Sequence, residues 1–303
     1  MNSIIYTIKR ILPEDRILIN ESMKAHTTFR TGGTADLFLM PENVDQLSEL
    51  IRFFREEEEE YFIIGNGSNL LVSDRGYRGA IIAVTEAFSD IEVSGTEIHA
   101  GAGALLSRIA DTARKHSLTG FEFASGIPGT AGGAMVMNAG AYGGEMKDVV
   151  KLVEVLTPDG ERVTLSNGEM GFGYRKSIIR KEGLTVLKIV FSLSPGNPEE
   201  IGAKMEELSA KRREKQPLEF PSAGSTFKRP EGHFAGKLIM DAGLSGFSVG
   251  GAFVSEKHCG FIINKGNATS NDVYRLIKKI QSVVKEGSGV ELEPEIMLIG
   301  EFE

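Results

Sequence analysis

Residues 126–144 read GIPGTAGGAMVMNAGAYGG, and seven of these nineteen positions are glycine. Glycine has no side chain, so a segment this rich in it lets backbone N–H groups approach an anion closely, and a helix that starts there adds a favourable dipole. The segment therefore predicts a cradle for a phosphate or pyrophosphate group. The alternative is a tight loop packed against a sheet, which needs glycine for steric reasons alone.

A second glycine cluster, GNGSN at residues 65–69, follows a β-branched run and is by itself typical of a turn. The common nucleotide fingerprints do not fit. Two G-x-G pairs, at 65–67 and 101–103, begin like G-x-G-x-x-G, but Leu70 and Leu106 stand where the third glycine is needed, and no G-x-x-x-x-G-K-[ST] occurs. A Rossmann or P-loop nucleotide site is therefore disfavoured.

The composition is that of a globular protein of two or three domains, with 303 residues, 41% hydrophobic, 25% charged and a formal net charge of −8. Glycine makes up 36 of the 303 residues, about 12% against a usual level of about 7%. An acidic chain argues against broad nucleic-acid binding, which requires a basic face for the phosphates. Any anionic ligand must then meet a local basic site.

The single cysteine, Cys259, cannot form an internal disulfide or by itself a zinc site. It therefore predicts a reducing compartment, the cytoplasm, and no metal. No run of about 18 apolar residues occurs, and the opening residues MNSIIYTIKRILPEDR lack the order of a secretory signal. We expect no membrane span.

Apolar spacing and turn residues predict helices and strands mixed without a strict βαβ rhythm, which indicates an α+β fold. Ser270 is the expected cap of the last helix and Gly287 its stop. Two prolines and a glycine in 194–198 predict a domain break near 196. The predicted helices are 43–60, 104–116, one beyond 198 with Ile201, Met205 and Leu208 on one face, and 270–286. The predicted strands flank 65–69, form a hairpin in 91–103, and lie in 149–193 around the turn Pro158-Asp159-Gly160.

Seven ordered motifs, from about residue 20 to the end, resemble the UDP-N-acetylenolpyruvoylglucosamine reductase family in its shorter, type II form. They are HTTFRTGG (26–33), IIGNGSNLLV (63–72), ASGIPGTAGGAMVMNAGAYGGE (124–145), FGYRKS (172–177), PSAGSTFKRP (221–230), DAGLSGFSVGGAFVSEKHCGFIIN (241–264) and LEPEIMLIG (292–300).

The resemblance implies a non-covalently bound FAD on a domain of the vanillyl-alcohol-oxidase type, in two subdomains (1–84 and 85–196), followed by a substrate-binding domain (197–303). It implies NADPH-dependent reduction of the enolpyruvyl group of a UDP-sugar to UDP-N-acetylmuramate, for the bacterial cell wall and hence cell shape and division. The FAD contacts implied by the motifs are Gly65, Asn66, Gly67, Ser68, Asn69, Pro128, Gly129, Thr130, Ala131, Gly132, Gly133, Asn138, Gly140 and Ala141.

The chemistry asks for a proton donor and a cation. Hydride added to the β-carbon of an enoate leaves negative charge at the α-carbon, spread into the carboxylate. Arg175 resembles the group that grips this carboxylate, Ser225 the proton donor, and Glu295 a third catalytic residue that orients the carboxylate. Without the motifs, the three would be a strand-end arginine, a turn-capping hydroxyl and a solvated glutamate.

The UDP diphosphate requires basic ligands, although the chain as a whole is acidic. Residues 204–237 form a locally basic segment, with eight Lys or Arg against five Asp or Glu. Arg213, Lys215 and Arg229 are the expected diphosphate ligands, and Tyr174 is expected to hydrogen-bond a phosphate. The alternative for Arg213 and Lys215 is that they complement the C-terminus of their own helix.

Two other functions stay open at the level of sequence. An FAD oxidase of a small alcohol would explain the glycine clusters but not the Tyr-Arg, Ser and Glu motifs together. A UDP-sugar-binding protein without catalysis would keep the basic segment.

Overall fold

The computed structural model describes residues 2–303, which form two compact units. Unit 1 contains the residues up to Ile19, Leu37–Asn66 and Gly79–Ala210, and unit 2 contains Asn20–Asp36, Gly67–Arg78 and Lys211–Glu303. Each unit has its own hydrophobic core. The expected division at 84 and 196 into flavin-binding and substrate-binding parts stays a prediction.

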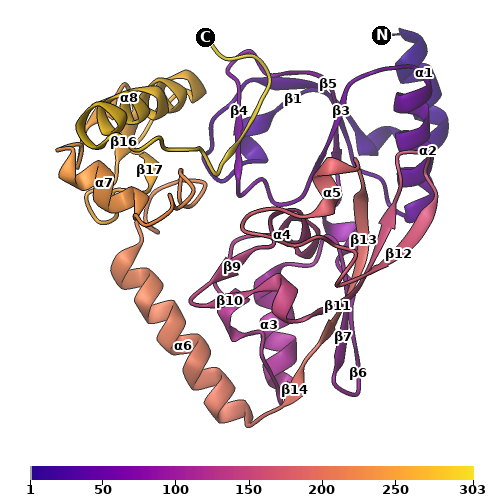
Figure 1. Ribbon diagram of the computed structural model, residues 1–303. Coiled ribbons are helices and arrows are strands. Elements are labelled where there is room, and N and C mark those ends of the chain that lie inside the picture. Colours follow the sequence, from indigo (N-terminus) through magenta and orange to yellow (C-terminus); the bar gives the residue numbers. More distant parts are fainter. Residues whose placement is uncertain (1) are drawn as a thin grey trace. The chain divides into compact units, whose positions relative to one another are not determined.

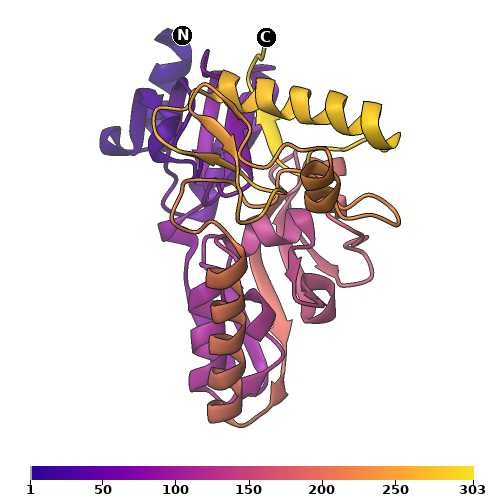
Figure 2. The same cartoon turned by 90° about the vertical axis from the view of Figure 1, so that its left-hand side faces the viewer.

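Two helices form one end of unit 1. Helix α1 (Asn2–Ile11) packs against α2 (Val44–Glu56), and the two lie side by side in Figures 1 and 2. Asn43 caps α2, because its side chain accepts a hydrogen bond from the Gln46 amide at 3.0 Å. The predicted helix at 43–60 is confirmed as far as Glu56, and residues 57–60 are exposed.

Four strands form the first sheet. Strands β3 and β5 run parallel, with Ile64 opposite Ala83. The predicted strand before the 65–69 loop is β3, which ends one residue before the loop. The order across the sheet is β1 (Ile17–Ser22), β2 (Thr34–Leu39), β5 (Tyr77–Ala83) and β3 (Tyr61–Ile64).

A five-stranded sheet lies wholly in unit 1 and is antiparallel throughout. The predicted hairpin in 91–103 is confirmed, and so are the strands around Pro158-Asp159-Gly160, where Gly160 adopts a φ of 76° that suits glycine. Helices α3 (Leu106–Lys115) and α4 (Ala131–Met137) pack on one face of this sheet (Figure 1). In order across the sheet, its strands are β12 (Arg162–Ser166), β11 (Val150–Leu156), β13 (Thr185–Ser192), β7 (Glu97–Gly101) and β6 (Ile91–Ser94).

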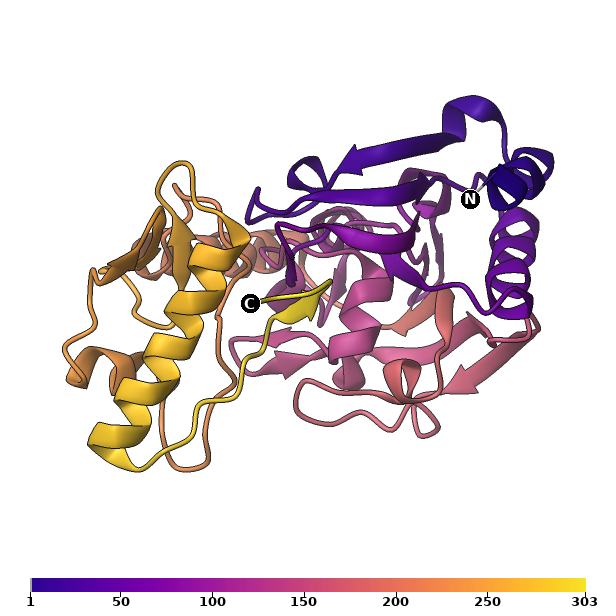
Figure 3. The same ribbon diagram turned by 90° about the horizontal axis from the view of Figure 1, so that it is seen from above.

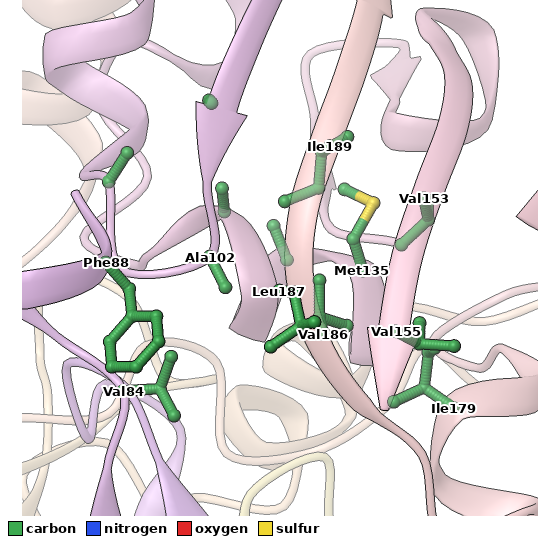
Figure 4. Close-up of a cluster of buried hydrophobic side chains, with 14 of the residues drawn as sticks. Val84, Phe88, Ala102, Met135, Val153, Val155, Ile179, Val186, Leu187 and Ile189 are labelled. Atoms are coloured by element: carbon green, nitrogen blue, oxygen red, sulfur yellow. The ribbon is translucent and has the colours of Figure 1, made fainter. Parts of the chain in front are cut away.

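The core of unit 1 lies between this sheet and its helices. In Figure 4, Met135 from α4 points between strand residues Val153 and Ile189, and all three are fully buried. This contact pins the glycine-rich segment to the sheet. The predicted helix at 104–116 is α3 (Leu106–Lys115), and the glycine segment contains α4 (Ala131–Met137) and a ribbon of β9 (Gly140–Ala141) and β10 (Gly144–Glu145).

The rest of unit 1 connects these elements. Strand β8 (Leu118–Thr119) pairs with β14 (Ser194–Pro195), and α5 (Ile178–Lys181) follows the FGYRKS loop. The predicted basic helix is α6 (Pro198–Lys215), which starts on a proline, as the first helical position allows.

Unit 2 is built on a small antiparallel sheet of β15 (Ser248–Val249), β16 (Ala252–Val254) and β17 (Ile262–Asn264). Helix α8 (Ser270–Ser288) lies against this sheet and α7 (Ala235–Asp241) packs on α8, as Figure 3 shows from above. The chain then returns as β18 (Met297–Ile299), which pairs in parallel with β4 (Leu70–Val72).

The predicted ends of the last helix are wrong by one and two residues. Thr269 is the N-cap, because its hydroxyl accepts from the Asp272 amide while the Asp272 carboxylate accepts from the Thr269 amide, both at 3.0 Å. Ser270 is buried inside the first turn and donates to the Thr31 hydroxyl at 2.8 Å. At the other end the left-handed cap is Gly289, with a φ of 75°. Gly287 lies within α8.

Because Gly287 lies inside α8 and Gly289 is its C-cap, replacing each by alanine should change the free energy of unfolding in opposite directions. Gly287→Ala should raise the free energy of unfolding by about 0.5 kcal/mol, because alanine favours a helix and the position is open. Gly289→Ala should lower it by about 1 kcal/mol, because an alanine Cβ is strained at positive φ. Urea denaturation measures both, and a loss of stability for Gly287→Ala would contradict the assigned helix end.

Candidate active site

Two glycine-rich segments touch each other within unit 1, one at Gly65 and Asn66 and the other at 128–130. The Asn66 side chain donates a hydrogen bond to the Pro128 carbonyl at 2.8 Å. A Cβ placed on Gly65 would lie 2.3 Å from Thr130 Oγ1, closer than any real Cβ contact. Glycine at position 65 is therefore required by the approach of the second loop.

Backbone donors remain available where these loops meet. Within residues 2–303, the amides of Gly65, Asn66, Gly129 and Thr130 make no hydrogen bond. Thr130 is also the N-cap of α4 and accepts from the Gly133 amide at 3.4 Å. Backbone amides without a protein partner, in two glycine-rich segments that touch, suit an anion such as a pyrophosphate, so the residues present fit that group.

Asn138 follows α4 and is fully buried in a left-handed conformation with a φ of 41°. Its amide nitrogen donates to Glu145 Oε2 at 2.9 Å and to the Gly173 carbonyl at 3.1 Å, and its oxygen accepts from the Lys147 amide at 2.9 Å. The side chain is thereby committed to protein groups. A flavin contact by Asn138, like those of Gly140 and Ala141 in β9, stays a prediction.

Arg175 and Tyr174 lie in the loop between β12 and α5. The Arg175 guanidinium carbon is 5.2 Å from the centre of the Tyr174 ring, and its Nη2 donates to the Gly140 carbonyl at 3.4 Å. The Tyr174 ring is about half exposed. A guanidinium within about 6 Å of the face of an aromatic ring is attracted to the ring.

Glu145 is an acidic group near Arg175 that the sequence motifs contain without indicating a role. A hydrogen bond from Lys147 lowers the pKa of Glu145 below its usual range, and the Asn138 amide and the Arg175 charge act in the same direction. Glu145 therefore stays ionised at neutral pH. Only the folded loops reveal the contribution of Arg175, because positions 145 and 175 are 30 apart in the chain.

Unit 2 brings Ser225 and Glu295 onto neighbouring paired segments. The Glu295 amide donates to the Thr226 carbonyl at 2.8 Å, and Phe227 bridges Pro294. On the other side Ser225 bridges Phe261, and the Thr226 hydroxyl accepts from the Ile262 amide at 3.1 Å. Thr226 is fully buried whereas Ser225 is exposed, so the threonine anchors the turn that presents the serine.

Asn69 joins the same cluster of unit 2. Its side-chain amide donates to the Glu295 carbonyl at 3.1 Å, and its own carbonyl accepts from the Met297 amide at 2.9 Å. The end of the second glycine cluster therefore supports the backbone that carries Glu295. Arg175, the third predicted catalytic residue, belongs to unit 1.

The predicted diphosphate ligands lie on two elements. Arg213 and Lys215 are exposed on the last turn of α6, where basic groups also complement the helix C-terminus. Arg229 is exposed near the Ser225 turn, with its guanidinium 4.0 Å from the centre of the Phe234 ring.

Curated relatives match nearly the whole chain. The UDP-N-acetylenolpyruvoylglucosamine reductase of Caldanaerobacter subterraneus is 58% identical over 97% of both chains, and that of Agathobacter rectalis is 54% identical over 96% of both.

The chain belongs to the UDP-N-acetylenolpyruvoylglucosamine reductase family.

Family models and solved structures agree with this membership. An FAD binding domain model matches residues 35–166, and the model for the C-terminal domain of UDP-N-acetylenolpyruvoylglucosamine reductase matches 216–299. The crystal structure of the reductase from Thermus caldophilus superposes with a TM-score of 0.81 at 36% identity, covering 94% of this chain and 98% of that chain. The predicted fold, α+β with an FAD-binding domain of the vanillyl-alcohol-oxidase type, is confirmed.

A more distant structure shares the fold alone. Phl p 4.0202, described as a glucose dehydrogenase, is 14% identical, has a TM-score of 0.51, and covers 65% of this chain and 44% of its own. Among residues 2–303, no helix is long and apolar enough to cross a membrane. The same residues contain no group of three His, Cys, Asp or Glu arranged to hold a metal ion.

The contact between the two glycine loops predicts a specific loss of FAD. In Gly65→Ala the added methyl group collides with Thr130, so one loop must move, and we expect FAD to bind at least about tenfold more weakly, about 1.4 kcal/mol. Titration of the apoprotein with FAD, followed by flavin fluorescence, measures this.

The matched control is Gly168→Ala, where a Cβ meets nothing within 4 Å and φ is ordinary. If both variants bind FAD like the parent protein, Gly65 is not required at the cofactor.

Proposed function

We propose that this protein reduces the enolpyruvyl group of UDP-N-acetyl-3-O-(1-carboxyvinyl)-glucosamine to UDP-N-acetylmuramate, with NADPH as reductant and FAD as carrier, in peptidoglycan synthesis. The observation that carries the proposal is the 58% identity to such a reductase over 97% of both chains. In this proposal the protein is an oxidoreductase that acts on a carbon–carbon double bond.

FAD, when bound, would supply the hydride chemistry between NADPH and the enolpyruvyl group. We assign the FAD pyrophosphate to the open amides of the 65–69 and 128–133 loops. Two features support the assignment: the loops touch through Asn66 and Pro128, and the amides of Gly65, Asn66, Gly129 and Thr130 have no protein partner among residues 2–303.

Residues of the chain then protonate the α-carbon and stabilise the negative charge on the substrate carboxylate in the proposal. Ser225 gives its hydroxyl proton to the α-carbon in the proposal. A serine is a weak acid, so the donation depends on the adjacent negative charge and on a fixed hydroxyl position. The anchoring of Thr226 between Ile262 and Glu295 supports such a fixed position.

Arg175 and Glu295 act on the substrate carboxylate in the proposal. Arg175 offers a planar fork of donors, which matches the two oxygens of a carboxylate as negative charge grows there. Glu295 orients the same group from the segment paired with the Ser225 turn. The diphosphate is assigned to Arg213, Lys215 and Arg229, with Tyr174 as an additional donor.

The competing functions gain no support from the comparisons. An FAD oxidase of a small alcohol and a catalytically inactive UDP-sugar-binding protein both conflict with the full-length match to reductases. An anaerobic experiment in two steps tests the proposal: NADPH should bleach the flavin, and the enolpyruvyl substrate should then restore its absorbance. If the substrate fails to restore the absorbance and oxygen admitted afterwards does so, the protein is an oxidase, and a colourless protein would indicate a binding role.

Ser225→Ala should separate the two half-reactions. Reduction of the flavin by NADPH should stay at the parent rate, whereas reoxidation by the enolpyruvyl substrate should slow by roughly 10²–10⁴, the range for loss of a positioned acid. Stopped-flow absorbance measures both rates. Ser222→Ala, a serine three residues earlier in the same turn region, is the matched control, and an unchanged reoxidation rate for Ser225→Ala would rule out its role.

Arg175→Lys should also impair only the second half-reaction. Lysine keeps the charge but cannot make two parallel hydrogen bonds to a carboxylate. We expect reoxidation to slow at least about tenfold, a loss of about 1.4 kcal/mol, while FAD binding is retained. Arg180→Lys, on the nearby α5, should behave like the parent, and equal slowing of both half-reactions would indicate a structural role for Arg175.

A further inference from the structure

The turn that holds Arg175 is strained. Gly173 and Lys176 exchange two backbone hydrogen bonds, of 3.0 and 3.3 Å, which close a tight loop around Tyr174 and Arg175. Arg175 sits at the left-handed corner with a φ of 55°. A side-chain-bearing residue pays about 1–2 kcal/mol in this conformation relative to an ordinary one. Contacts outside the turn must therefore keep it in place.

Two side-chain hydrogen bonds tie this turn to the glycine segment, one on each side of Arg175. Before the arginine, the Gly173 carbonyl accepts from Asn138 Nδ2 at 3.1 Å. After it, the Ser177 hydroxyl donates to the Val136 carbonyl at 3.1 Å. Both ends of the turn are therefore tied to the glycine segment, and Arg175 Nη2 reaches the Gly140 carbonyl of β9.

The direction of the Asn138 amide is set by its other partners. Glu145 can only accept hydrogen bonds while ionised, and Lys147 keeps it ionised by a contact of 2.9 Å. The Lys147 amide in turn can only donate, and it faces the Asn138 oxygen. The nitrogen must then face Glu145, and its second proton falls on the Gly173 carbonyl.

We propose that Asn138 is a positioning residue for Arg175: through the Gly173 carbonyl it holds the turn that aims the guanidinium at the substrate carboxylate. The inference rests on the proposed function, because it takes Arg175 as the group that meets the carboxylate. It assigns the Asn138 side chain to the orientation of the turn and not to the flavin. All the residues involved lie in unit 1.

Asn138→Asp tests the proposal with a side chain of the same shape. Aspartate keeps an oxygen for the Lys147 amide but cannot donate to Gly173 or Glu145. We expect FAD affinity and the NADPH half-reaction to stay within about twofold of the parent. Reoxidation by the enolpyruvyl substrate should slow by roughly 10–100-fold, since a misplacement of about 1 Å costs up to about 10².

A double-variant comparison distinguishes positioning from general damage. In an Arg175→Lys background, Asn138→Asp should change the reoxidation rate by less than about twofold, because both changes remove the same interaction. The Nε–H resonance of Arg175, followed by NMR and assigned by its loss in Arg175→Lys, should broaden or shift in Asn138→Asp. This second readout does not depend on turnover.

Two further variants separate the effect of losing the hydrogen bond from Asn138 to Gly173 from a general loss of stability. Asn138→Asp combined with Glu145→Gln reverses the polarity of that pair and restores its hydrogen bond, so thermal stability should recover while reoxidation stays slow. Asn167→Asp is the matched control, because Asn167 also donates to two backbone carbonyls, Lys147 at 2.8 Å and Val150 at 2.7 Å, without touching the Arg175 turn. It should leave reoxidation unchanged.

The inference and the proposed function fail in different ways. If the flavin of Arg175→Lys is reoxidised by the substrate at the parent rate, Arg175 does not act on the substrate carboxylate and the proposed role is wrong. If Arg175→Lys is slow but Asn138→Asp is not, or if the two effects multiply, Asn138 does not act through Arg175. If Asn138→Asp weakens FAD binding or slows both half-reactions alike, Asn138 is a flavin contact or a purely structural residue.

Discussion

The contact between the 65–69 loop and Thr130 is the constraint on which the predicted cofactor site depends. One loop follows the end of β3 and the other leads into α4, so two separate sheets of the fold determine how closely they approach. The approach is closer than a Cβ allows, and it leaves peptide amides of both loops without protein partners among residues 2–303. Backbone donors held in this way are preorganised for an anion, because no side chain has to move.

In unit 2, backbone pairing between segments places the side chains of the candidate site. Successive side chains of an extended segment point to opposite sides, so the burial of Thr226 turns Ser225 outward. Pairing with the 293–295 segment then brings Glu295 alongside. Asn69 supports that segment from the end of the glycine cluster, which links a residue expected at the cofactor to the backbone of a residue expected at the substrate.

Local patterns predicted helices α2, α3, α6 and α8 and strands β3, β6, β7, β11, β12 and β13, and chose the wrong residue where two nearby residues could serve equally well. Thr269 and Ser270 are both good caps, and Gly287 and Gly289 are both good stops. Burial of Ser270 against Thr31, a residue 239 positions away, decides the first choice. The backbone conformation at Gly289 decides the second. Neither is visible in a window of adjacent residues.

The sequence by itself determined the family, the α+β class and the residue types at the candidate site, because ordered motifs and hydrophobic periodicity survive as local patterns. The tertiary structure decided which of those residues share a cluster. It paired Ser225 with Glu295, and it enclosed Asn138 between Glu145 and Gly173. The physical reason is that hydrogen bonds between distant segments depend on the register of strands and the angle of turns, and a linear sequence specifies these only through the whole fold.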